Sequence, residues 1–253
     1  MHQMIADELT EIDRAFAGNR LLSTFPAEAR SAIEPHCEIV RLRQGDTIFR
    51  PGELLTSSLF PFGQTIASLV VELNSDRTVQ VASIGREGAV GGIVSCGEAP
   101  AFSDAKVLIG GPALKVSLDA LQEAKQSNEF IANIFCRFAD YLLSKVMQSV
   151  ACNAFHSIPQ RAARWLLITQ DRAGDRIELT QEQLAGLLGV QRTTVNAVIR
   201  ELQDAGLITS SRGAIHVTDR AGLKQRACEC YSAVDSHFSK VIGPGGIGGV
   251  RAG

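Results

Sequence analysis

The sequence predicts an α+β protein with an N-terminal β jelly roll, one long helix and a C-terminal winged helix. Three observations support this prediction. Short β-like runs with glycine turns fill the first half of the chain, a stretch without proline or glycine covers residues 127–155, and a helix-turn-helix pattern covers residues 180–202. The expected parts are a jelly-roll sensor domain (1–126), a dimerisation helix (127–155), a winged helix (156–241) and a flexible tail (242–253).

Composition is ordinary for a globular protein. Of the 253 residues, 45% are hydrophobic and 21% are charged. No apolar run approaches the roughly 20 residues that a membrane helix needs, and the acidic, amphipathic N-terminus does not resemble a secretory signal. The six cysteines are scattered, so we expect reduced thiols in a cytoplasmic protein.

The formal charge of −2 hides an asymmetry along the chain. Residues 156–226 contain ten lysines and arginines against seven acidic residues, a balance of +3, whereas residues 1–155 carry −5. A mildly basic C-terminal part beside an acidic N-terminal part is typical of a protein with one nucleic-acid-binding domain.

The first half of the chain reads as a barrel or jelly roll. Glycine-containing turns such as Gly45 and Gly52 separate runs of β-forming residues, and many short strands of this kind indicate such a fold. The expected strands are 37–42, 47–49, 58–60, 65–73, 79–84 and 106–109.

The long helix has an apolar residue every three or four positions. A helix of this length between two domains has few surfaces of its own chain to pack on, so we expect it to pair with a second copy. The predicted dimer interface consists of Ile131, Phe135, Phe138, Leu142 and Val146.

The helix-turn-helix pattern begins at Thr180. This residue can cap a first helix together with Gln183, and Gly189 suits the positive φ at the end of that helix. Ala185 is small where the two helices cross, and Val195 holds the second helix against the first. Two short strands, 207–209 and 214–217, then form the wing.

The second helix of this pattern, expected over 191–202, exposes hydrogen-bonding and cationic side chains. Amides and guanidinium groups read base edges in the major groove, whereas phosphate contacts set the register. Arg192 is the candidate for a bidentate guanine contact, with Gln191, Thr193 and Asn196 as further base-reading residues. The phosphate contacts are expected from Thr180, Arg200 and Arg212.

A jelly roll, a long helix and a winged helix in this order resemble the Crp/Fnr family of bacterial transcription regulators. The resemblance is carried by the turns at Gly45 and Pro51-Gly52-Glu53, the 85–92 segment, the long helix and above all residues 179–208. It implies a homodimeric regulator that binds double-stranded DNA at an inverted repeat and is not an enzyme. RNA polymerase is a further candidate partner.

The effector signatures of the family are absent from this chain. Where members that bind cyclic nucleotides carry a glutamate and an Arg-Ser pair, this chain has Gly92 and Ser103-Asp104, so cyclic AMP is not expected and the effector is unidentified. Iron–sulfur members carry a cysteine cluster near the N-terminus, and this chain has no cysteine before Cys37.

Other cofactors are not expected either. His36 or Cys37 could supply an axial haem ligand, but an isolated histidine or cysteine is more often structural, so we favour a structural role. Cys228 and Cys230 are predicted to lie on one helix and to point to opposite sides, so no metal site is expected. Cys152, near the end of the long helix, is either a buried, inert thiol or a thiol that forms a cross-link or senses an oxidant.

Two other classes compete with this interpretation. A cupin-like metal enzyme needs an H-x-H pair, a third histidine and a carboxylate, and the five histidines contain no such pair. A winged helix used only for protein contacts is the other alternative, and a gel-shift with genomic fragments separates it from a DNA-binding protein.

Overall fold

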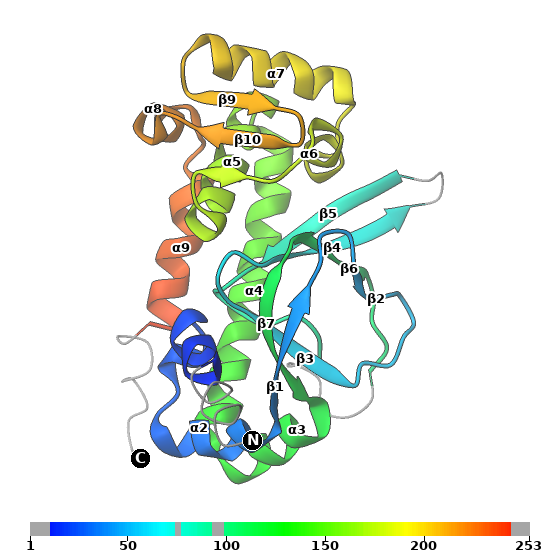
Figure 1. The fold of residues 1–253 in the computed structure, drawn as a ribbon, viewed down its shortest axis with the longest axis vertical. Coiled ribbons are helices and arrows are strands. Elements are labelled where there is room, and N and C mark those ends of the chain that lie inside the picture. The colour runs from blue at the N-terminus through cyan, green and yellow to red at the C-terminus, as the bar shows by residue number, and fades with distance from the viewer. Residues whose placement is uncertain (1–10, 74–76, 93–98, 244–253) are drawn as a thin grey trace.

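The computed structural model describes residues 11–73, 77–92 and 99–243. A β sandwich lies beside the lower and middle part of a long helix, α4 (Glu129–Phe155), and a winged helix lies at the upper end of that helix (Figure 1). This arrangement agrees with the predicted α+β fold class. No helix in the described ranges combines the length and the apolar character that crossing a membrane requires.

The β domain consists of two antiparallel sheets with the strand orders β1-β7-β3 and β2-β6-β4-β5. The strands are β1 (Cys37–Leu42), β2 (Thr47–Phe49), β3 (Ser57–Pro61), β4 (Ile66–Leu73), β5 (Arg77–Ile84), β6 (Asp104–Ile109) and β7 (Gly111–Ser117). Alternate side chains of the two sheets face each other, as in a sandwich, and enclose a small core around Leu59, Ile84 and Ala105.

Strand β7 is missing from the sequence prediction. It is the central strand of its sheet, because Val116 pairs with Cys37 on one side and with Ser58 on the other. Gly111 and Pro112 indicated a turn, since proline has no N–H for a sheet ladder. Pro112 lies near the start of the strand, where its carbonyl accepts hydrogen bonds from Phe62 N at 3.2 Å and Thr65 Oγ1 at 2.8 Å.

Helical segments at the N-terminus pack against α4. Residues 11–18 are helical, and the segments that follow are η1 (Leu22–Thr24), α2 (Ala27–Ile33) and η2 (Glu34–His36). After the strands, α3 (Leu118–Ser127) leads into α4, whose N-terminus is capped by the Asn128 side chain. The main core contains apolar residues of all these segments except η2.

The stripe on α4 that was predicted to pair two chains is largely buried within one chain. Ile131 is 0% exposed, and Phe135 and Phe138 are 1% exposed. A Cβ at Gly88 would lie 2.1 Å from the Phe138 ring, so glycine is needed for this close approach. The predicted role of these three side chains in a dimer interface is therefore wrong. Helical periodicity reveals that a stripe is buried, but not which surface buries it.

The chain after the wing forms two helices, α8 (Arg220–Arg226) and α9 (Cys230–Val241), where one was expected. Helix α9 runs back along α4 toward the N-terminal segments (Figure 1). The Phe238 ring meets the Tyr141 ring edge-on at 4.9 Å, and Asp235 pairs with Arg20 at 2.9 Å. Ile242, which the sequence assigned to a tail, is 0% exposed, and residues 244–253 of that tail lie outside the described ranges.

A buried ion cluster joins the β domain, α4 and α5 (Ile158–Ala173). Glu87, which follows β5, accepts hydrogen bonds from Lys145 Nζ of α4 at 2.8 Å and from the Arg172 guanidinium of α5. All three side chains are at most 10% exposed. Burial opposes ionisation of Glu87, but Arg172 and Lys145 outweigh it and lower the pKa of this carboxyl from 4.5 to about 2.

Candidate DNA-binding site

The helix-turn-helix consists of α6 (Gln181–Leu188) and α7 (Arg192–Asp204). The Thr180 hydroxyl accepts from Gln183 N at 3.1 Å, and the Gln183 side chain accepts from Thr180 N at 2.8 Å. Gly189 has φ 66° and ψ 37° and so ends α6 in the left-handed conformation. The capping box and the glycine turn predicted from sequence are both confirmed.

Apolar contacts fix the orientation of α7. Ala185 of α6 and Val195 of α7 are 3% and 0% exposed and belong to one core, which also contains Ile199 and Leu202. A three-stranded sheet completes this domain, with β8 (Arg176–Ile177), β10 (Ala214–Val217) and β9 (Ile208–Ser211) in that order. The predicted winged helix is therefore present.

The winged helix also contacts the β domain of the same chain. Trp165 Nε1 of α5 donates to Gln80 Oε1 of β5 at 3.3 Å, and Gln44 Nε2 donates to the Glu178 carbonyl at 2.8 Å. Helix α6 packs on β5, and Ile66 and Ile109 of the β domain join the core of the winged helix. These contacts set the position of the helix-turn-helix relative to the β domain.

All seven residues predicted to contact DNA are exposed. Five of them lie along α7 or at its N-cap, one caps α6, and one lies in the β9–β10 turn. They are Gln191, Arg192, Thr193, Asn196 and Arg200, then Thr180, and then Arg212. The structure thus gathers donors, acceptors and cations on the side of α7 that faces away from its core.

Arg192 and Thr180 already have partners in the free protein. Arg192 Nε lies 3.7 Å from Glu182 Oε2, and both side chains are more than half exposed. Exposed ion pairs of this kind are weak, so Arg192 can leave Glu182 for a base. Thr180 uses its backbone N–H and its hydroxyl in the cap of α6, where the hydroxyl accepts from Gln183 N and donates to Gln183 Oε1.

Helix α4 presents a second apolar stripe, which the sequence interpretation did not assign to the dimer interface. Leu143, Met147 and Val150 are 55%, 62% and 65% exposed. Their spacing of four and three residues is that of a coiled-coil seam. Leu142 and Val146, from the predicted interface, are half-buried, and Leu142 packs on the core of the β sandwich. The heptad spacing is visible in the sequence, but the larger aromatic stripe on the same helix obscured it.

A cavity of about 220 Å³ lies between the β sandwich and α4. Gly92 and Ser103, which align with the nucleotide-binding positions of the family, both line it, whereas Asp104 is buried in β6 and does not. The lining residues in the described ranges include no charged side chain. A Cβ at Gly92 would lie 2.3 Å from Leu118 Cδ1, so a glutamate at this position would require Leu118 to move.

Comparison with known proteins agrees with this architecture. Residues 160–226 match the Crp-like helix-turn-helix domain. The HTH-type transcriptional regulator Cmr of Mycobacterium tuberculosis is 42% identical over 71 residues, 28% of this chain and 28% of that protein. The CRP-like cAMP-activated global transcriptional regulator of the same organism is 26% identical over 136 residues, 51% of this chain and 61% of that protein. The matched region is thus less than two thirds of either relative.

Solved structures extend the likeness to the whole fold. FixK2 from Bradyrhizobium japonicum superposes with a TM-score of 0.65 at 16% identity, covering 76% of this chain and 98% of that one. A putative regulator of the crp/fnr family from Eubacterium rectale gives 0.62 at 16% identity, covering 81% and 96%. Together, the fold and the exposed α7 surface define a winged-helix protein with a β-sandwich domain. Residues 160–226 form a Crp-like helix-turn-helix domain, and the chain as a whole shares its fold with the solved regulator of the crp/fnr family.

Proposed function

We propose that this protein is a homodimeric regulator of transcription that binds a specific inverted repeat in double-stranded DNA. The observation that carries the proposal is the exposed polar side of α7 in a Crp-like helix-turn-helix domain. Its amide, hydroxyl and guanidinium groups are the side chains that pair with base edges in a major groove.

The exposed stripe on α4 supplies the surface for a second copy. Leu143, Met147 and Val150 are large apolar side chains in contiguous helical turns, and pairing them with the same residues of another chain removes them from water. A twofold axis along such a seam places two α7 helices on one side of the dimer. Helix-turn-helix dimers read half-sites about 34 Å apart, which gives the inverted repeat.

Arg192→Ala is expected to weaken binding to the preferred site by ~1–3 kcal/mol and to relax base preference at one position of each half-site, because it removes a bidentate contact to guanine. Arg200→Ala is expected to weaken all sequences alike and to reduce the salt dependence of binding, because it removes a phosphate contact. Selection from a random DNA pool, followed by anisotropy titration at several salt concentrations, measures both effects.

Arg50→Ala serves as the charge control, since Arg50 is an exposed residue of the β domain that pairs with Glu53 at 3.6 Å. This variant should select the wild-type motif with wild-type affinity. If the Arg192→Ala protein selects the same motif as the wild type, Arg192 does not contribute to base recognition. Failure of the wild-type protein to enrich any sequence would reject the proposed function and favour a protein-interaction role.

Cyclic AMP and cyclic GMP are not expected to bind. A buried phosphate needs a cation to offset its desolvation, and none lines the cavity beside Gly92 among the described residues. The mycobacterial relative is named as a cAMP-activated regulator, but we do not expect cyclic AMP to activate this protein. Isothermal calorimetry with each nucleotide is expected to give only heat of dilution, and a micromolar dissociation constant for either would contradict the assignment. The cavity suits a smaller apolar effector.

A further inference from the structure

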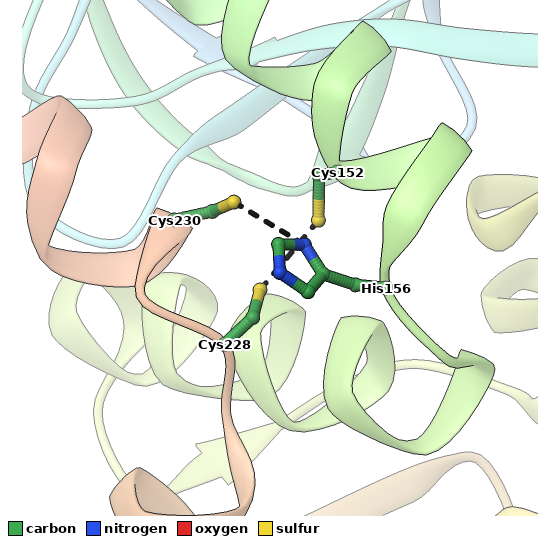
Figure 2. A group of neighbouring side chains, drawn as sticks. All are labelled: Cys152, His156, Cys228 and Cys230. Atoms are coloured by element: carbon green, nitrogen blue, oxygen red, sulfur yellow. Dashed lines mark hydrogen bonds between the residues drawn. The ribbon is translucent and has the colours of Figure 1, made fainter.

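Four potential metal ligands converge where α4 ends and α9 begins. Cys152 lies in the last turn of α4, and His156 is the C-cap residue of that helix. Cys228 lies in the link between α8 and α9, and Cys230 is the first residue of α9. Figure 2 shows the three sulfur atoms and the imidazole ring directed toward one another from these two segments.

The α8–α9 link explains why the sequence interpretation rejected a metal site. Cys228 and Cys230 were placed on one continuous helix, where alternate residues point apart. In the structure, residues 227–229 interrupt the helix, so Cys228 is not helical. This break turns both thiols toward the end of α4, and the reason given against a metal site is wrong.

The distances match a tetrahedral centre. Cys152 Sγ lies 3.6 Å from Cys228 Sγ, Cys230 Sγ lies 3.5 Å from His156 Nδ1, and all four ligand atoms lie within 4.8 Å of one another. Zinc–sulfur bonds of about 2.3 Å and zinc–nitrogen bonds of about 2.0–2.1 Å give tetrahedral edges of about 3.8 Å and about 3.6 Å. Only small movements would therefore bring all four atoms into zinc coordination.

Outer contacts orient two of the ligands. Glu229 Oε1 lies 3.2 Å from His156 Nε2, so the carboxylate can hold the imidazole with Nδ1 directed into the cluster. Gln148 Nε2 donates to Cys230 Sγ at 2.9 Å. A carboxylate behind the histidine is the usual outer partner at zinc sites, where it fixes the tautomer of the ring.

The donor set and its burial select the metal. The three thiols are between 0% and 4% exposed, and the His156 side chain is 16% exposed. Three sulfurs and one imidazole form a known structural zinc set, and soft ligands of this kind are poor for magnesium or calcium. An iron–sulfur cluster would spread the four ligands over two or four iron atoms, and therefore needs a wider spacing than a single ion.

We propose that Cys152, His156, Cys228 and Cys230 bind one zinc ion in tetrahedral coordination. Binding converts the three thiols to thiolates and releases their protons to solvent, and His156 binds as the neutral imidazole through Nδ1. The ion links the end of α4 to the start of α9 and holds the α4–α5 connection, which includes His156 and Ser157.

Metal analysis of the full-length protein tests the site directly. Untagged protein purified under reducing conditions is expected to contain about one zinc ion per chain, as measured by inductively coupled plasma mass spectrometry. His156→Gln and Cys228→Ser should lose that zinc, whereas Cys136→Ser, which removes an exposed thiol elsewhere on α4, should retain it. Glu229→Gln keeps every ligand and should weaken zinc binding ~10-fold in competition with a chelator.

Cobalt gives a readout that does not depend on how the variants fold. Metal-stripped, reduced wild-type protein titrated with cobalt chloride should develop the visible bands of tetrahedral cobalt and the near-ultraviolet bands of cobalt–thiolate bonds. Absence of these bands, together with absence of zinc in the isolated protein, would overturn the proposal. Isolation of the protein with iron and acid-labile sulfide would overturn it as well. So would a Cys152–Cys228 disulfide in the isolated protein, if the protein still binds no metal once that disulfide has been reduced.

A second measurement concerns the role of the ion and rests on the proposed DNA-binding function. Because the ion would fix the α4–α5 connection, we infer that it sets the position of α7 relative to α4. Stripping zinc should lower the affinity for the selected DNA about tenfold, and restoring zinc should recover it. Zinc binding with unchanged DNA affinity would reject this role and leave the metal site intact, whereas failure of the wild-type protein to bind DNA would concern only the proposed function.

Discussion

The double replacement Leu143→Glu and Met147→Glu is expected to convert the proposed dimer to a folded monomer and to weaken specific DNA binding at the same time. Burial of each of these side chains contributes ~1.5–3 kcal/mol, and each contributes twice in a symmetric seam. A loss of only ~3 kcal/mol raises the dimer dissociation constant more than about 100-fold. The seam of the double variant would also bring two glutamates of one chain against two of the other, and the repulsion between these like charges would weaken the dimer further.

Sedimentation velocity at micromolar concentration measures this change, with circular dichroism to show that the chain is folded. Ser236→Glu is the matched control, because it places a carboxylate on the exposed side of α9 and should leave a dimer. Phe138→Glu provides the contrast, since Phe138 is 1% exposed in the core of one chain, so this variant should lose stability and yield less folded protein. A wild-type monomer at these concentrations, or a dimeric double variant, would reject the exposed stripe as the interface.

Glu87→Gln is expected to destabilise the protein by ~3–5 kcal/mol, because it leaves Lys145 and Arg172 buried without their counter-charge. The amide is nearly the same size as the carboxylate, so the loss reflects charge and not a cavity. Unfolding in urea, followed by circular dichroism, measures the free energy. Glu53→Gln removes the partner of Arg50 in an exposed pair and should change stability by less than about 1 kcal/mol.

The same carboxylate is expected to contribute to acid sensitivity. Since the pKa of Glu87 is lowered in the folded protein, its contribution is fully present above the unfolded value of 4.5 and is lost as the pH falls toward about 2. The difference between these two pKa values corresponds to roughly 3 kcal/mol. Stability of the wild type minus that of Glu87→Gln, measured across this window, should shrink as pH falls, and a constant difference would contradict the lowered pKa.

Local patterns in the sequence were sufficient for much of the fold and for the scaffold of the candidate site. The capping box at Thr180, the left-handed glycine at Gly189 and the apolar spacing through Val195 each depend on neighbours within a few residues, so they can be recognised without tertiary contacts. The exposure of Arg192 and Asn196 on α7 follows from the same helical period.

The partners of those elements were decided only by the tertiary structure. The period of α4 shows that Phe135 and Phe138 are buried, but residues 11–36, the β sandwich and α9 bury them, and this leaves Leu143, Met147 and Val150 on the outside. Strand β7 forms despite Pro112 because it has a strand on each side.

The convergence of Cys152 and His156 with Cys228 and Cys230 likewise depends on the chain returning more than seventy residues later, at a break between two helices. Sequence spacing determines which residues share a face within one element. Which faces meet is set by the packing of elements distant in sequence, and a residue's immediate neighbours carry no record of that packing.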